Sequence, residues 1–504
     1  MPLRLPEIRT PVSLRGLLPN CSFVGCADIL VSDATEHSSH CGPSSLFAAL
    51  QGNKNDGSNF ANEAIQRGAN ALLVQQPIAT VTVPQCVVPD ARRAFAVLCE
   101  ALAGNPSQRI RVAGVTGTNG KTTTTWLIRS ILQAAGKRTG LLGTIEYDDG
   151  ETAKASHLTT PDSKTCSSWL RAMVERGTTH AAIELSSHAL DQSRASGVFL
   201  DAAVVTNVTQ DHLDYHSSPE SYRASKAKIF ERCRTDGLIA INTDDAGCRE
   251  LKSHCQGTGR LVTYGIDAPA DVSAEVVEES RTGNRFVLDL MGERVEVSSS
   301  LVGRHNISNC IAAATVARHF GLDNSEIAAG LASLKSVPGR LETIQLGQPF
   351  HVYVDYAHTD DALRRAIASL RHLTSGRVIC VFGAGGDRDR SKRPLMAQAA
   401  ANADIAVVTS DNPRNEDPEQ IIEDVLAGFS TTTETYVEAD RAQAIRWALQ
   451  EAEPGDCVLI AGKGHEAVQI MGSDRVEFDD RVVTRRLLAE SMQPVQSEPY
   501  RVPA

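Results

Sequence analysis

Residues 117–123, GTNGKTT, combine the residue types that bind phosphate. They follow an apolar run at residues 110–116 and precede a stretch with a helical pattern. The two glycines let the backbone turn its N–H groups inward, Lys121 supplies a cation, and the Thr122 hydroxyl can bind Mg²⁺. Val115 occupies the first glycine position of the usual G-x-x-x-x-G-K-[ST] pattern, so the segment is a shorter variant. The alternative is a glycine-rich turn with a chance lysine, but the flanking strand and helix favour a phosphate cradle.

Candidate metal ligands follow two further apolar runs. Glu184 ends the first run, and Asp211, His212 and Asp214 follow the second. A carboxylate one strand away from the cradle can complete a Mg²⁺ shell. Taken alone, His212 is more often a core or surface histidine, but its neighbour Asp211 favours the metal site. The 12 cysteines contain no C-x-x-C pair, so no zinc site is predicted.

A second group of charged residues lies in the last third of the chain. Residues 411–414 (DNPR) follow one apolar run, Arg388 follows another, and Glu466 follows a third in the segment GKGHE. Arginine can bind a carboxylate through two parallel hydrogen bonds, while Asp and Glu can bind an amine. We therefore predict a pocket for a zwitterion, the alternative being an exposed cluster of salt bridges.

The elements that must position these residues read as α/β structure. Continuous apolar strands that alternate with helical patterns and end in polar loops indicate a mostly parallel sheet covered by helices on both faces. The 504 residues suggest roughly three domains. Breaks at residues 103–110 (AGNPSQRI) and 336–342 (SVPGRLE) divide them into a small N-terminal α/β domain (1–106), a central P-loop-type domain (107–337) and a C-terminal Rossmann-like domain (338–504).

Composition excludes several function classes. The net charge of −11 gives no electrostatic support for a nucleic-acid partner. We expect no membrane span, because no apolar run reaches the about 18 residues that one needs, and we see no signal peptide. Scattered cysteines favour reduced, mostly buried thiols and a cytoplasmic protein.

The motifs together resemble the Mur ligases, the ATP-dependent amide-bond-forming ligases of peptidoglycan synthesis. In chain order they are GTNGKTT, ELSSHAL, DHLDYH, GRHNISN, PGRLE, DYAHT, GGDRD, DNPR and GKGHE. The resemblance is dense over residues 117–466 and weak in the first hundred. It implies that the γ-phosphate of ATP passes to the D-Glu carboxylate of UDP-MurNAc-L-Ala-D-Glu, and that the amine of meso-2,6-diaminopimelate attacks the acyl phosphate. The implied participants are these small molecules and Mg²⁺. We expect the protein to be a monomer.

The resemblance also implies roles by position. The catalytic residues would be Lys121, Glu184, His212 and Lys226. Lys226 would react with CO₂ to form a carbamate and hold Mg²⁺ together with Thr122, Glu184 and His212, whereas Lys228 belongs to a solvated helix face. The ATP-binding residues would be Gly117, Thr118, Asn119, Gly120, Lys121, Thr122, Thr123, Asn306, Arg340 and Asp355. The UDP-substrate-binding residues would be Ser38, Thr159, Thr160, Ser186, Gln192 and Arg194. The amino-acid-binding residues would be Arg388, Asp411, Asn412, Pro413, Arg414, Gly462 and Glu466.

The sequence departs from the family pattern at two places. Residues 37–39 read HSS where the family usually has Asp-Ser-Arg near the uridine, and Asp360 stands where Pro is frequent.

Three alternative functions accompany this interpretation. They are a ligase similar to folylpolyglutamate synthetases, the same reaction with L-lysine, and a nucleotide-gated binding protein without turnover. An Arg414 that pairs with the far carboxylate would favour diaminopimelate over lysine. Closure of the domains over the acyl phosphate would exclude water, with hinges near Pro106 and Pro338.

Overall fold

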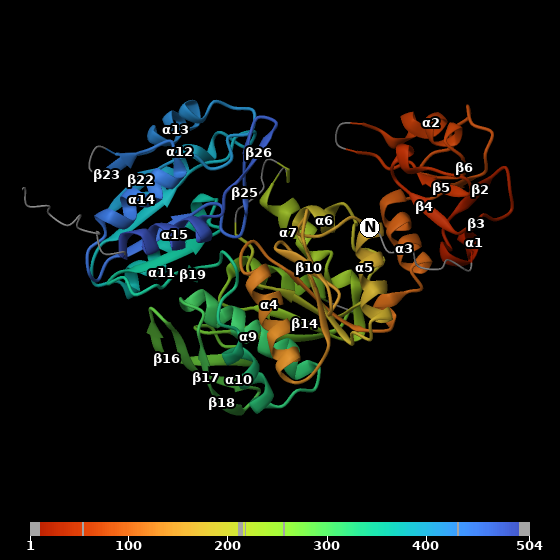
Figure 1. Cartoon of the computed structure of the whole chain (residues 1–504). Coiled ribbons are helices and arrows are strands. Elements are labelled where there is room, and N and C mark those ends of the chain that lie inside the picture. Colours follow the sequence, from red (N-terminus) through yellow and green to blue (C-terminus); the bar gives the residue numbers. More distant parts are fainter. Residues whose placement is uncertain are drawn as a thin grey trace, which may run out of the picture. The chain divides into compact units, whose positions relative to one another are not determined.

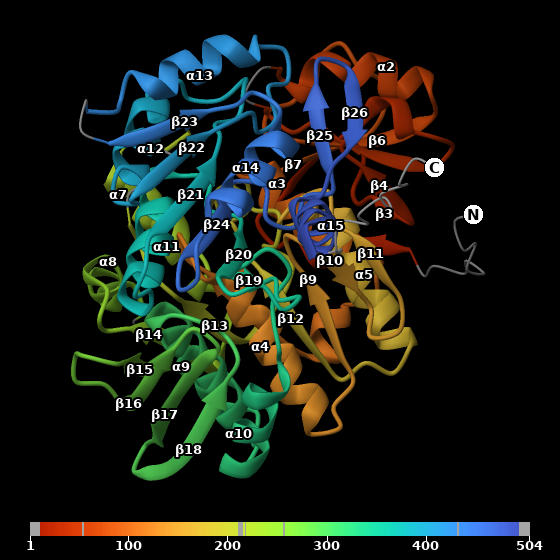
Figure 2. The same ribbon diagram turned by 60° about the vertical axis from the view of Figure 1, so that its left-hand side comes forward.

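The computed structural model describes residues 11–52, 55–209, 215–216, 218–255, 258–430 and 433–492. Residue contacts divide the chain, whose elements are labelled in Figures 1 and 2, into two units. The first comprises Met1–Ala274, Leu288–Val295 and Ser308–Gly330, and the second comprises Glu275–Val287, Glu296–Ile307 and Leu331–Ala504.

The first hundred residues build a five-stranded sheet in the order β2-β7-β6-β5-β4. Strands β4 to β7 pair in parallel, and β2 pairs antiparallel with β7. Side chains of β5 alternate between the faces: Leu46 packs with Phe95 of α3, and Phe47 packs with Ala61 of α2. The elements are β1 (Val12–Ser13), α1 (Leu14–Leu17), β2 (Ser22–Val24), β3 (Leu30–Val31), β4 (Asp33–Thr35), β5 (Ser45–Ala48), α2 (Ala61–Gln66), β6 (Ala69–Val74), β7 (Gln85–Val87) and α3 (Ala91–Leu102).

An eleven-stranded sheet follows in the order β11-β10-β9-β12-β8-β13-β14-β15-β16-β17-β18. Its middle strands are parallel, and in spatial order they are β9, β12, β8, β13, β14 and β15. The strands are β8 (Arg111–Thr116), β9 (Thr139–Leu142), β10 (Glu146–Asp148), β11 (Ala153–Ala155), β12 (His180–Glu184), β13 (Leu200–Val205), β14 (Cys233–Asn242), β15 (Arg260–Gly265), β16 (Val272–Ser280), β17 (Gly283–Leu290) and β18 (Glu293–Ser299). The helices are α4 (Lys121–Ala134), α5 (Ser163–Glu175), α6 (Ser187–Asp191), α7 (Pro219–Ala227), α8 (Ala246–Glu250), α9 (Arg304–His319) and α10 (Asn324–Ser333).

The register of this sheet brings the predicted site segments to one edge. Glu184, the last residue of β12, pairs with Val115 of β8, and Val205 of β13 pairs with Thr116. The turns after β8, β12 and β13 therefore emerge side by side, as expected for parallel strands. All five residues of β12 are buried, which explains its continuous apolar run.

The C-terminal sheet has six strands in the order β19-β20-β24-β21-β22-β23, all parallel except β19. One of its faces packs against α11, α12 and α13, and the other packs against α14 and α15. This doubly wound arrangement confirms the predicted α/β class. The elements are β19 (Glu342–Thr343), β20 (His351–Asp355), α11 (Asp360–Leu373), β21 (Val378–Phe382), α12 (Lys392–Ala400), β22 (Ile405–Val408), α13 (Pro418–Leu426), β23 (Glu434–Val437), α14 (Arg441–Glu451), β24 (Cys457–Ala461), the hairpin β25 (Val468–Met471) with β26 (Asp474–Glu477), and α15 (Asp480–Met492).

The cysteines are all free thiols, as predicted. Nine of the twelve are buried, and Cys21, Cys26 and Cys41 are half-buried. None of the helices in the described parts of the chain is long and apolar enough to cross a membrane.

Candidate active site

The phosphate cradle lies between β8 and α4, where the sequence predicts it. Gly117 and Gly120 adopt φ angles of +151° and +84°. A Cβ at Gly117 would lie 1.8 Å from Thr206 Oγ1, so no larger residue fits this turn. Lys121, the first residue of α4, donates from Nζ to the carbonyl oxygens of Gly117 (2.8 Å) and Thr118 (2.9 Å). The lysine and the helix N-terminus thus lie at the same loop, which is the arrangement that binds phosphate.

Glu184 is fully buried beside the start of α4. The Thr122 hydroxyl donates to Glu184 Oε2 at 3.0 Å, and the Thr144 hydroxyl donates to the same oxygen at 2.8 Å. The Thr144 N–H donates to Oε1 at 2.8 Å. A hydroxyl and a carboxylate side by side at a phosphate cradle are oxygen ligands that suit Mg²⁺. The structure therefore brings together two of the predicted metal ligands.

The remaining metal predictions are only partly described. Asp211, His212 and Asp214 lie outside the described residues. Within the described ranges, no group of three or more His, Cys, Asp or Glu side chains could hold a metal ion. Among the described residues, Thr122 and Glu184 are therefore the predicted metal ligands that lie in contact with each other.

Lys226 lies near the end of α7 and is 1% exposed. Its Nζ lies 4.4 Å from the centre of the Tyr222 ring, and the Tyr222 hydroxyl lies 3.1 Å from Thr118 Oγ1 of the cradle. Tyr222 thus connects Lys226 with the phosphate-binding loop. Lys228 differs, as the sequence suggests: it is partly exposed and pairs with Asp191 at 2.8 Å.

Five of the six residues predicted to bind the UDP-sugar substrate form one cluster next to Glu184. The Thr160 hydroxyl donates to the Glu184 carbonyl at 2.7 Å and accepts the Ser186 N–H at 3.0 Å. Arg194 donates to the Thr160 carbonyl at 3.3 Å and to Gln192 Oε1 at 2.7 Å. Thr159 joins the cluster through its hydroxyl, whose Oγ1 lies 3.1 Å from Oγ1 of Thr144.

The sixth residue, Ser38, lies in the N-terminal sheet region and donates to Glu63 Oε2 at 3.0 Å. Nearby, Glu36 has a pKa raised by burial and by Asp162, and Arg194 acts in the opposite direction. The Tyr215 hydroxyl accepts from Gln192 at 3.2 Å. The sequence singled out neither Glu36 nor Tyr215 as a neighbour of this cluster.

The other predicted ATP residues belong to the second unit. Asp355 ends β20, where its carboxylate accepts from the N–H groups of Leu341 (2.7 Å) and Ala357 (2.8 Å), and burial raises its pKa. The Arg340 guanidinium lies 4.7 Å from the centre of the Tyr356 ring. Asn306 is buried in α9, where its side chain donates to the Val302 carbonyl at 2.8 Å.

The predicted amino-acid pocket gathers at the carboxyl ends of β22 and β24. Asn412 donates from Nδ2 to Glu466 Oε2 at 2.8 Å. Gly462 has a φ of +113°, and a Cβ there would lie 2.6 Å from Asp411 Oδ2. Pro413 is buried in the same segment. Asp411 and Asn412 are also buried, and their contacts with Gly462 and Glu466 place them against the loop after β24.

Arg388 and Arg414 flank the same glycine. A Cβ built at Gly385 would lie 2.9 Å from Arg414 Nη1 and 3.7 Å from Arg388 Cγ. Arg414 itself has a φ of +53° and donates from Nη1 to the Gly386 carbonyl at 2.7 Å. Its backbone N–H donates to Ile470 of β25 at 3.0 Å. The two predicted arginines thus lie together, as a carboxylate site would require.

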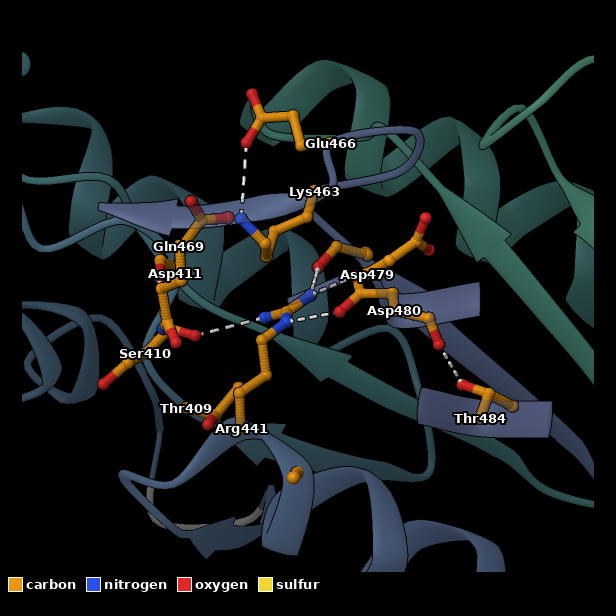
Figure 3. A network of polar contacts seen from close by, with 12 residues as sticks. Thr409, Ser410, Asp411, Arg441, Lys463, Glu466, Gln469, Asp479, Asp480 and Thr484 are labelled. Carbon is orange, nitrogen blue, oxygen red and sulfur yellow. Dashed lines mark hydrogen bonds and ion pairs between the residues drawn. The ribbon is translucent and has the colours of Figure 1, made fainter. Parts of the chain in front are cut away.

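Arg441 and Asp480 form a buried pair next to the strand ends that carry this pocket (Figure 3). Arg441 donates from Nε and Nη2 to the two oxygens of Asp480, both at 2.7 Å. It also donates to the carbonyls of Ser410 (3.3 Å) and Ala461 (2.8 Å), which immediately precede Asp411 and Gly462. One guanidinium therefore fixes the ends of two strands, a role that no local sequence signal indicated.

Comparison with known proteins agrees with this geometry. Residues 35–102 match the Mur ligase family, catalytic domain; residues 115–317 match the Mur ligase middle domain; and residues 339–464 match the Mur ligase, glutamate ligase domain. The chain belongs to the Mur ligase family.

Curated relatives narrow the comparison. The UDP-N-acetylmuramoyl-L-alanyl-D-glutamate–2,6-diaminopimelate ligase of Geobacillus thermodenitrificans is 44% identical over 461 residues, which cover 90% of this chain and 94% of that protein. The ligase of the same name from Solibacter usitatus is 43% identical over 493 residues, 96% of this chain and 98% of that protein. A solved structure of a ligase of this name matches with a TM-score of 0.69 and 31% identity, and covers 95% of this chain and 99% of that one.

Proposed function

We propose that this chain is the ATP-dependent ligase that joins meso-2,6-diaminopimelate to the D-Glu carboxylate of UDP-MurNAc-L-Ala-D-Glu. The observation that carries the proposal is the continuous set of hydrogen bonds around Glu184. Its carboxylate accepts from Thr122 of the cradle, and its carbonyl accepts from Thr160 of the predicted substrate cluster. A nucleotide phosphate and an acceptor carboxylate bound at these two groups would lie on either side of one strand end.

The residues of the chain divide the chemistry as follows. The cradle N–H groups and Lys121 bind the β- and γ-phosphates and offset the charge that develops on the transferring phosphoryl group. Thr122 and Glu184 would hold Mg²⁺, which supplies further charge stabilisation to the phosphate oxygens. The Thr160 and Arg194 cluster orients the acceptor. The D-Glu carboxylate attacks the γ-phosphorus as ADP leaves, and the amine then attacks the acyl carbon and expels inorganic phosphate.

Lys226 is proposed as the carbamate-forming lysine. Its ammonium would first lose a proton, and the neutral amine would then add to CO₂ and release a second proton, so that a carbamate anion replaces a buried cation. An anion near the cradle suits Mg²⁺, whereas an ammonium does not. The position of Lys226, buried and one tyrosine away from Thr118, supports this assignment.

The domain assignment and specificity belong to the same proposal. The matched family ranges support an N-terminal domain at 1–106, a central domain at 107–337 and a C-terminal domain at 338–504. Arg414, beside Arg388, would bind the far carboxylate of diaminopimelate, a group that L-lysine lacks. We propose a monomer that works in the cytoplasm.

The folylpolyglutamate synthetase alternative is weaker. The structure of the Mycobacterium tuberculosis folylpolyglutamate synthase matches with a TM-score of 0.61 but only 18% identity and covers 73% of this chain and 92% of that one, so the likeness shows a common fold alone. The relatives named as diaminopimelate ligases are 43–44% identical to this chain.

Phosphate release by the purified protein tests the proposal. The reaction contains Mg-ATP and UDP-MurNAc-L-Ala-D-Glu, with meso-diaminopimelate, L-lysine or no amino acid. We expect release with diaminopimelate only, and a product heavier by one diaminopimelate residue. Release with L-lysine as well would overturn the specificity, and release with neither would overturn the reaction.

A further inference from the structure

Lys463 is a fully buried lysine inside the predicted amino-acid pocket, and the reaction scheme above gives it no role (Figure 3). It follows β24 in the segment GKGHE. Its Nζ lies 2.7 Å from the Val468 carbonyl, 3.2 Å from Asn412 Oδ1 and 3.4 Å from Glu466 Oε2. An ammonium has three protons and no acceptor, so these three oxygens match its full donor capacity.

The ammonium and the Ile470 N–H together determine which way the Asn412 amide faces. Because Lys463 can only donate, it requires the amide oxygen of Asn412 to lie on its side. The Ile470 N–H donates to the same oxygen at 3.0 Å. The amide nitrogen of Asn412 is then directed at Glu466, where it donates to Oε2 at 2.8 Å.

Lys463 also holds one oxygen of Glu466 inward. Oε2 receives both the Lys463 and the Asn412 donors, whereas Oε1 lies 3.5 Å from the Tyr356 hydroxyl. The Glu466 side chain is 31% exposed although that of Lys463 is completely buried. Glu466 is thus anchored through one oxygen and accessible through the rest of its carboxylate.

We propose that Lys463 is a positioning residue for the incoming amino acid. It orients Asn412 and Glu466 so that the accessible part of the Glu466 carboxylate receives the amine end of the substrate, while Arg388 and Arg414 receive carboxylate. Lys463 touches neither substrate nor nucleotide, so its effect passes through these two neighbours. The inference rests on the proposed function, since it assigns the pocket to diaminopimelate.

The test compares full-length Lys463→Met and Lys463→Arg with the control Lys335→Met, which changes an exposed lysine of the same unit. Initial rates are measured against diaminopimelate, ATP and UDP-MurNAc-L-Ala-D-Glu in turn, and thermal melting checks the fold. We expect Lys463→Met to raise the KM for diaminopimelate about tenfold or more, since a charged hydrogen bond is lost at each of two ligand-binding groups. The KM values for the other two substrates should stay within about twofold, and Lys463→Arg should recover part of the loss.

Other outcomes separate the two levels of the argument. A wild-type protein without diaminopimelate-dependent turnover would overturn the proposed function and this inference with it. An active wild type whose Lys463→Met variant has an unchanged KM for diaminopimelate, or equal losses for all three substrates, would overturn the role of Lys463 alone. If Lys463→Met does not fold, Asn412→Ala takes its place, and an unchanged KM for diaminopimelate in that variant would overturn the inference.

Discussion

Arg441 and Asp480 form an ion pair in which both side chains are completely excluded from solvent, with an N···O distance of 2.7 Å. The pair joins the first residue of α14 to the first residue of α15. The pKa of Arg441 is raised by Asp480 and Asp411 against the effect of burial, so the guanidinium stays charged. Because the same group binds two strand-end carbonyls, its loss would leave several buried polar groups without partners.

Replacing Arg441 with Met should therefore destabilise the protein by about 3–5 kcal/mol, because the Asp480 charge would be left buried and unpaired. Urea unfolding followed by circular dichroism measures this change. Arg446→Met is the matched control on the same helix, since Arg446 and Glu490 are 39% and 46% exposed and such pairs contribute about 0–1 kcal/mol. Equal effects of the two substitutions would contradict the assigned importance of the buried pair.

Glu184→Gln should lower kcat by about 10²-fold or more while ATP still binds. The substitution removes a negative charge from the site assigned to Mg²⁺. The new amide also places an N–H donor against the N–H or hydroxyl of Thr144. Turnover assays and isothermal titration with an ATP analogue separate the two effects. Glu175→Gln, in a partly exposed i,i+4 pair with Arg171, should change neither quantity. Normal turnover by Glu184→Gln would exclude the metal-binding role.

Arg414→Ala should lower kcat/KM for diaminopimelate by roughly 30- to several-thousand-fold, the equivalent of about 2–5 kcal/mol for an unpaired buried charge. The KM for ATP should change by less than about twofold. Arg414→Lys should recover little, because a lysine lacks the planar fork that binds a carboxylate twice. Arg390→Ala is the control, since Arg390 is an exposed residue paired with Asp424. Equal losses toward diaminopimelate and ATP would contradict a specificity role.

The buried side chain of His180 should make the free energy of unfolding depend on pH. Burial, with Arg111 and Lys137 nearby, lowers its pKa from 6.5 to about 4. The unfolded chain therefore binds this proton at a higher pH than the folded protein, so His180 favours the folded state above pH 6.5. That contribution is lost as the pH falls from about 6.5 to about 4.

The corresponding measurement is urea unfolding at pH 7, 5.5 and 4.5. The free energy of unfolding should fall less steeply with decreasing pH in His180→Gln than in the wild type. His254→Gln, which changes an exposed histidine, should follow the wild type. Parallel curves for His180→Gln and the wild type would contradict the shifted pKa.

Local patterns were enough to predict most of the fold and the strand ends that carry the candidate site. Continuous apolar runs identified β8, β12, β22 and β24, and each is a fully or almost fully buried parallel strand. The cradle could be read because its glycines, lysine and threonine are adjacent in sequence. Its position next to Glu184 followed from the tendency of parallel strands to end at one edge.

Other features had no local signal. Arg441 and Asp480 are 39 residues apart, and neither belongs to a motif, so their pairing depends on how α14 and α15 pack on one face of the sheet. Thr144 lies in the turn after β9 and reaches Glu184 only through the pairing of β9 with β12. Lys463 is inside a recognised motif, but its burial depends on the β25 hairpin that supplies the Val468 carbonyl.

The division into half-buried and buried thiols allows the native protein to be labelled with a fluorescent reagent at a defined region. The three cysteines that are not buried all fall between residues 21 and 41, and the raised pKa of Cys41 slows its reaction relative to an ordinary thiol. A maleimide fluorophore applied to the native protein would therefore attach to the N-terminal sheet region, where these three thiols lie. The nine protected thiols would react only as the chain opens, so the same reagent reports both on the labelled region and on global unfolding without any engineered cysteine.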